Sequence, residues 1–185
     1  MRLLARLMGV AALLVVASWT ATAQNTKGQK SSSSDLPLDD QTFVTKAAAD
    51  GKHEVMLGEM AKNQGASAEV KKFGERMITD HTKANQDLMT AAKAANIAVP
   101  GGLPDEQTKE YDRFKNLKGA EFDKAYIKHM VEDHEKAVKL FENASKNLKD
   151  PGLKAVATKT LPTIKEHLEM AKKLGGGTGK PERRP

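Results

Sequence analysis

The sequence contains no cysteine and few aromatic residues, and both absences narrow what the protein can do. Without cysteine the chain has no disulfide, no thiolate nucleophile and no cysteine ligand for a metal ion. Phe, Trp and Tyr together make up 4% of the residues, so no basic face is interleaved with aromatic side chains as nucleic-acid binding requires. We therefore expect a fold held by its apolar core alone, and no nucleic-acid partner.

Long hydrophobic runs are also scarce, and the one that occurs stands near the N-terminus. Arg2 and Arg6 accompany an apolar run that ends near Ala17, and Ala21-Thr-Ala23 fits a signal-peptidase site. We expect residues 1–23 to be an export signal, and the protein to be periplasmic or peripherally attached to the envelope. Lipid attachment would need a cysteine, so a lipoprotein is not expected. No later segment approaches the roughly 20 apolar residues of a transmembrane span.

Two further segments have compositions typical of flexible chain. Residues 24–39 include the run Ser31-Ser-Ser-Ser34 and Pro37, and residues 175–185 are rich in glycine and arginine. We expect a disordered linker, a folded domain over residues 40–174 and a disordered basic tail. The tail leaves open a partner at the membrane surface or in the envelope, and nothing in the sequence indicates an oligomeric state.

Apolar residues in the remaining segment repeat at spacings of three and four, which is typical of amphipathic helices. The pattern predicts helices over about 40–63 and 68–95, and a third helical region over about 104–148 with a kink or break near Gly119. A fourth helix begins at Pro151 and should bend at Pro162. Two short connections and one longer one favour an all-α, antiparallel four-helix bundle.

Three histidines fall on the apolar faces of three different predicted helices: His81, His134 and His167. Counted from the connections near positions 65 and 150, each lies about 16 residues along its helix, or roughly 24–26 Å at 1.5 Å per residue. The three imidazoles should therefore share one layer of the bundle interior. Glu54 on the first helix, with Asp50 as a weaker alternative, is predicted to supply a carboxylate near that layer.

An acidic residue precedes each of these histidines directly. Because one residue advances a helix by about 100°, Asp80, Asp133 and Glu166 should face neighbouring helices or solvent instead of sharing the site. His53 and His129 fall off the apolar faces, so we expect them to be exposed.

Several segments of the chain match a known pattern, and together they resemble the bacterial domain of unknown function 4142 family over about residues 41–174. The resemblance implies a ferritin-like four-helix fold in exported proteins, with no settled activity. The matching segments are Phe43-Val-x-x-Ala47, Glu54-Val-x-Leu-Gly58, Phe73-x-x-x-Met77-x-x-Asp80-His81, Gly119-x-x-Phe122-Asp123-x-x-Tyr126, Asp133-His134 and Thr160-Leu-Pro162-x-x-x-x-His167.

Two interpretations of the histidine layer remain open. In the first, the imidazoles hydrogen-bond to Asp50 or Glu54 and fix the helix register of a non-enzymatic interaction or stress-related module. In the second, the layer and a carboxylate bind one transition-metal ion (copper, zinc or iron) in a periplasmic metal-binding protein. Met77 and Met130, each four residues before a layer histidine, are weaker candidate ligands that suit Cu(I) but also suit a core.

Catalytic motifs are not found in the sequence. The paired Glu-x-x-His motif of di-iron and di-manganese bundles is missing, and Ser67 and Ser145 do not lie at a strand-to-helix elbow. We therefore expect no catalytic residues and no cofactor beyond a metal ion.

Overall fold

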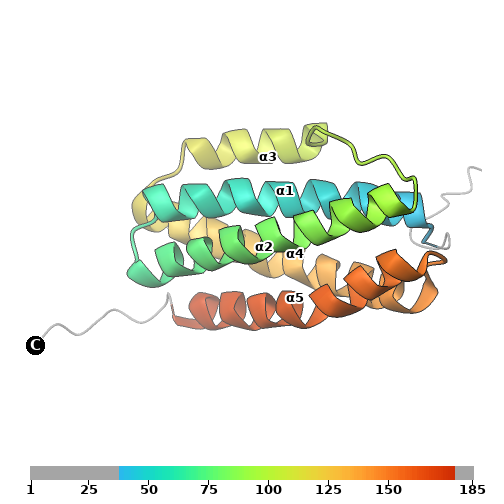
Figure 1. Ribbon diagram of the computed structural model, residues 1–185. Helices are drawn as coiled ribbons and strands as arrows, with labels where there is room; N and C mark the ends of the chain where they lie inside the picture. Colours follow the sequence, from blue (N-terminus) through green and yellow to red (C-terminus); the bar gives the residue numbers. More distant parts are fainter. Residues whose placement is uncertain (1–37, 178–185) are drawn as a thin grey trace, which may run out of the picture. The chain divides into compact units, whose positions relative to one another are not determined.

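The computed structural model describes residues 38–177, and these residues form five α-helices (Figure 1). The predicted export signal, most of the predicted linker and the last residues of the predicted tail lie outside the described residues. Within residues 38–177 no strand forms, apart from one isolated bridge between Gly65 and Gly119, so the all-α prediction is confirmed. The helices are α1 (Asp40–Gln64), α2 (Ala68–Ala94), α3 (Asp105–Lys115), α4 (Gly119–Asn147) and α5 (Pro151–Gly177).

The four long helices form a closed ring of neighbours. Helix α1 packs against α2 and α4, and α5 packs against α4 and α2. Helix α3 lies outside this ring, where it covers α1 and also contacts α4 (Figure 1). The chain within residues 38–177 contains no helix that is long and apolar enough to cross a membrane.

The third helical region, for which the pattern predicts a kink or a break near Gly119, contains a break. It consists of two separate helices, α3 and α4, and the break falls at the predicted place. Gly119 begins α4 with a φ of 61°, a left-handed conformation that glycine adopts without strain. Helix α5 continues through Pro162 and ends at Gly177, three residues beyond the predicted end of the folded domain.

Side-chain caps determine where three of the long helices begin. The side chains of Asp39, Ser67 and Asp150 accept hydrogen bonds from backbone N–H groups three residues further on, at 2.7–3.1 Å. Asp123 ties the start of α4 to the α1–α2 connection, because its carboxylate accepts from the backbone N–H groups of Ala66 and Ser67 at 2.9 and 2.8 Å. These contacts align the helices along the bundle.

The core is divided into two apolar clusters with a polar layer between them. One cluster includes Leu57, Phe73 and Tyr126, and the other includes Phe43 and Leu148. On each long helix the residues of the two clusters lie on either side of a buried or half-buried polar residue. The residues of this layer are Glu54 on α1, His81 on α2, His134 on α4 and His167 on α5.

Candidate functional site

The three-histidine site consists of His81 from α2, His134 from α4 and His167 from α5. The ring centroids are 5.3–5.8 Å apart, and one ring nitrogen of each histidine lies within 4.8 Å of those of the other two. His134 and His167 are each about 1% exposed. The structure thus brings these three imidazoles together, as their helical phase and depth predict.

Two of the three imidazoles have one nitrogen held in place by a neighbour. His134 Nδ1 donates to the backbone carbonyl of Met130 at 2.9 Å, and His167 Nε2 donates to Asp80 Oδ2 at 2.9 Å. Each ring also keeps a buried nitrogen without a hydrogen-bond partner among residues 38–177: His81 Nε2, His134 Nε2 and His167 Nδ1. One nitrogen anchored to a carbonyl or carboxylate and the other left free is the usual arrangement of a metal-ligating histidine.

All three imidazoles are held in the neutral form at neutral pH. Burial, reinforced by the neighbouring imidazoles, lowers the pKa of His81 well below its ordinary value and that of His134 to about 4. Burial also lowers the pKa of His167, although the hydrogen bond to Asp80 opposes that effect. Neutral imidazole is the form that binds metal ions.

Glu54 is the first-helix carboxyl that lies nearest to the three-histidine site. Its Oε1 is 4.0 Å from His134 Nδ1, which is too long for a hydrogen bond, and its Oε2 is buried without a partner in the described part of the chain. Burial, and then the nearby Asp133 and Asp50, raise the pKa of Glu54 well above its ordinary value. The carboxyl therefore favours its neutral form unless a cation lies beside it.

The other predicted ligands of the three-histidine site lie in different surroundings. Asp50 is half-buried and accepts a hydrogen bond from Gln107 on α3 at 2.6 Å, while burial raises its pKa to about 6. Met77 and Met130 are fully buried in the apolar cluster that contains Phe73. Their thioethers fill core space next to the polar layer.

The prediction that His53 and His129 are exposed is wrong, since they are 0% and 5% exposed. Helix α3 packs against α1 and α4 and contacts His129: the ring of Phe114 lies 5.5 Å from that of His129, and Glu110 Oε1 lies 3.1 Å from His129 Nδ1. The sequence pattern places residues 105–115 in the third helical region and does not show that this segment packs over α1 and α4. The apolar face of that segment was the available signal, because it has to pack against other helices.

The acidic residues before the layer histidines are closer to the buried imidazoles than predicted. Asp80 does face a neighbouring helix, but there it holds the outer nitrogen of His167. Asp133 Oδ2 lies 3.3 Å from His129 Nε2, and Glu166 is exposed. Two of the three acids therefore contribute to the surroundings of buried imidazoles.

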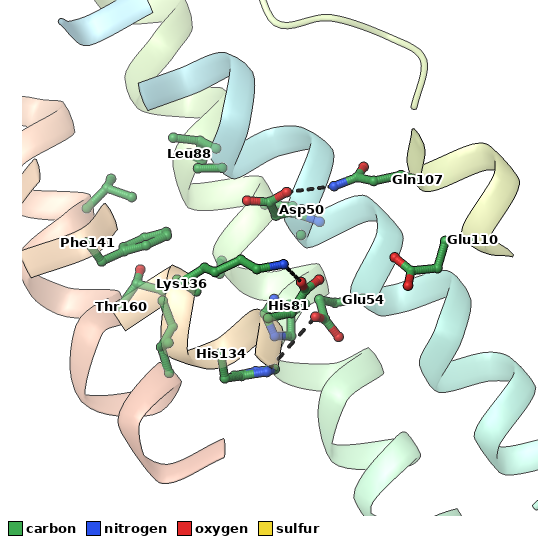
Figure 2. A pocket seen from close by; sticks show the side chains of 18 of the residues that line it. Asp50, Glu54, His81, Leu88, Gln107, Glu110, His134, Lys136, Phe141 and Thr160 are labelled. Carbon is green, nitrogen blue, oxygen red and sulfur yellow. Dashed lines mark hydrogen bonds and ion pairs between the residues drawn. The ribbon is translucent and has the colours of Figure 1, made fainter. Parts of the chain in front are cut away.

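A pocket of about 230 Å³ reaches this region and is lined by side chains from all five helices (Figure 2). Its wall includes the exposed Glu106 and the buried Glu54, so the pocket connects the surface with the polar layer. An acidic lining concentrates cations relative to bulk solvent. Apart from histidine, its acidic and basic residues, within the described part of the chain, are five acids and one lysine: Asp50, Glu54, Glu106, Glu110, Asp133 and Lys136.

Comparison with solved structures places this fold among known helical bundles. CopM in its Cu(II)-bound form is 18% identical, with a TM-score of 0.61, and the match covers 76% of this chain and 98% of that chain. CopM in its Cu(I)-bound form is also 18% identical, with a TM-score of 0.61 and coverage of 74% and 94%. A DUF305 protein from Streptomyces coelicolor, described as secreted, is 12% identical, with a TM-score of 0.61 and coverage of 78% and 97%. These similarities show a shared fold.

No curated protein matches the chain. The model of the family described as "Domain of unknown function (DUF4142)" matches residues 22–174. The chain belongs to this family, as the resemblance of its segments implies.

Proposed function

For this member of the DUF4142 family, we propose that the function is to bind one transition-metal ion, copper or zinc, at the three-histidine site. The observation that carries the proposal is the convergence of three buried imidazoles from three helices, each with a nitrogen that lacks a hydrogen-bond partner among the described residues. A buried polar atom without a partner costs about 1–3 kcal/mol. A metal ion bound between the rings would supply the missing partner for all three.

The spacing of the ring nitrogens is compatible with one ion. Three nitrogens that each bind one ion at about 2.1 Å are at most about 3.6 Å from one another. The nitrogens here lie within 4.8 Å of one another, so each has to move by less than about 1 Å toward their common centre to come into range. Asp80 and the Met130 carbonyl would then orient His167 and His134 from outside the site.

Glu54 is the candidate fourth ligand. A bound cation would favour its ionised form, which burial otherwise disfavours, and its unpartnered Oε2 is available within the described structure. Met77 and Met130 remain weaker candidates, which would matter most for Cu(I).

Copper is the first ion to test, because the structural neighbour CopM is copper-bound. Three imidazoles without thiolate ligands also suit Zn²⁺. Iron is disfavoured by the lack of paired Glu-x-x-His motifs, so we propose a metal-binding protein without ferroxidase activity.

The proposed setting is the bacterial cell envelope, after removal of residues 1–23. The export pattern at the N-terminus supports this setting, as does the description of the DUF305 neighbour as secreted. We further propose that the ring of four long helices is an antiparallel, ferritin-like bundle, bent at Pro162, to which α3 is added.

The test is a titration of tag-free, metal-free protein with Cu(I), Cu(II) and Zn²⁺, followed by metal analysis after equilibrium dialysis. The triple variant His81→Ala/His134→Ala/His167→Ala should bind one equivalent fewer than the wild type. Glu166→Gln is the matched control, because it changes an exposed residue next to His167 and should keep the full stoichiometry. Circular dichroism checks the fold, and the single variant His81→Ala serves if the triple variant unfolds.

Equal stoichiometry and affinity in the wild type and the folded histidine variants would overturn the proposal. The layer would then be structural, and the alternative of a non-enzymatic interaction or stress-related module would replace metal binding.

A further inference from the structure

A second group of metal-ligand side chains lies on the side of the bundle that α3 covers. The mixed site, as we call it, consists of His53 from α1 and His129 and Asp133 from α4. One ring nitrogen of each histidine and one carboxylate oxygen of Asp133 lie within 4.8 Å of one another. The two imidazole rings meet edge to face, with their centroids 5.6 Å apart. None of these side chains belongs to the three-histidine site.

His53 is buried without any visible compensation for its polar atoms. The residue is 0% exposed, and neither of its ring nitrogens has a hydrogen-bond partner among residues 38–177. His129 Nε2 also lacks a hydrogen bond within this range, although Asp133 Oδ2 lies 3.3 Å from it. A purely structural polar cluster would be expected to satisfy these nitrogens, because each orphaned atom costs free energy. The orphaned nitrogens point instead to a ligand.

Glu110 on α3 gives His129 the arrangement that Asp80 gives His167. Its Oε1 lies 3.1 Å from His129 Nδ1, so a carboxylate lies beside that nitrogen while Asp133 Oδ2 lies 3.3 Å from the opposite one. This carboxylate–histidine pairing fixes the ring orientation and raises the ligand basicity at metal sites.

The pocket reaches the mixed site at Asp133. Glu110 and Asp133 line its acidic wall together with Lys136, whose Nζ lies 3.1 Å from Asp133 Oδ1. Lys136 is exposed, so an arriving cation can displace its ammonium group into solvent. Asp133 Oδ1 thus already binds one cationic group, the ammonium of Lys136.

We propose that the mixed site binds a second metal ion, a divalent cation such as Zn²⁺, with His53, His129 and Asp133 as ligands and Glu110 as the positioning residue for His129. Two imidazoles and one carboxylate suit divalent ions of intermediate softness better than Cu(I), which prefers thiolate, thioether or imidazole ligands. The proposal rests on side chains that the three-histidine site does not use.

The experiment is a titration of the tag-free, metal-free protein with Co²⁺ and Zn²⁺, because Co²⁺ has visible absorption bands that report its coordination. The variants are Asp133→Asn, His53→Gln and the triple alanine variant of the three-histidine site. Asp133 is only half-buried, so Asp133→Asn should fold normally, and circular dichroism checks this. Asp112→Asn is the matched control, because it also removes an α-helical carboxylate that is paired with a lysine.

We expect the triple variant to bind one equivalent of Co²⁺. Adding Asp133→Asn or His53→Gln to the triple variant should weaken the affinity for this Co²⁺ ion by at least tenfold. Asp112→Asn should change nothing. This result would support the mixed site even if the three-histidine site bound no metal.

Two results would overturn the second site. One is a triple variant that binds no ion while folded Asp133→Asn keeps one equivalent, in which case the proposed function stands alone. The other is a triple variant that binds one Co²⁺ ion with an affinity that neither Asp133→Asn nor His53→Gln changes.

Discussion

The three-histidine site and the mixed site lie close to the same buried carboxyl of Glu54, but they are assembled in different ways. The first is made by three helices of the four-helix ring, whose apolar faces place the imidazoles in the interior. The second depends on α3, which lies outside the ring and buries the outer sides of α1 and α4. A helix that adds little to the core can therefore create a polar site by covering a surface.

The two sites also differ in charge. The three-histidine site contains neutral imidazoles and has Asp80 behind one of them, whereas the mixed site includes an ionisable carboxylate and has Glu110 behind His129. Burial lowers the pKa of His53 to about 4, as it does for His134. The comparison predicts that both sites bind metal through neutral imidazole, but that the mixed site favours divalent cations more strongly.

The largest expected effects come from the two carboxylates that hold ligating histidines from outside. Asp80→Asn should weaken metal binding at the three-histidine site by about 10–100-fold, and Glu110→Gln should do the same at the mixed site. Each variant should leave the other site unchanged, because its side chain contacts one site directly. Competition titrations of both variants with Cu(I) and Co²⁺ measure this. If either variant weakened both sites equally, the two sites would have to be treated as one.

An intermediate effect is expected in the pH dependence of stability of the metal-free protein. The pKa of His134 is about 4 in the folded protein and about 6.5 in the unfolded chain, so its contribution to stability is present above pH 6.5 and is lost as the pH falls toward 4. Removing this group with His134→Gln should reduce the slope between pH 6.5 and 4 by up to about 1.4 kcal/mol per pH unit.

Asp50 and Glu54 change the pH dependence of stability with the opposite sign, so the slope of the wild type is a sum of several contributions. The difference in slope between His134→Gln and the wild type isolates the contribution of His134. The raised pKa values of Asp50 and Glu54 mean that the folded protein gains stability from them as the pH falls. Urea unfolding followed by circular dichroism, with a chelator present, measures the slope. His53→Gln should flatten the slope in the same way. An unchanged slope in both variants would show that these imidazoles bind protons with the same pKa in the folded and the unfolded protein.

The smallest expected effect is at Lys136, whose ammonium group competes with a cation for Asp133. Exposed ion pairs contribute about 0.2–1 kcal/mol, so Lys136→Gln should tighten Zn²⁺ binding at the mixed site by at most about fivefold. Binding at the three-histidine site should stay as it is. Weaker binding at the mixed site would show that Lys136 supports the site instead of competing for it.

Helical periodicity was enough to predict the three-histidine site. A helix is rigid, so the spacing of His81, His134 and His167 along the chain translates directly into direction and depth. The mixed site could not be predicted in this way. His53 and His129 lie off the apolar faces of their helices, and both are buried on the sides of α1 and α4 against which α3 packs, with Phe114 and Glu110 of α3 beside His129.

The sequence alone determined the all-α class, the break near Gly119 and the inward phase of the layer histidines. Each of these depends on interactions within a few residues of the chain. The tertiary structure decided that α3 is a separate covering helix, and that Asp80 and Glu110 reach imidazoles on other helices. Those contacts join residues that are far apart in sequence, so they depend on which helices become neighbours and not on local spacing.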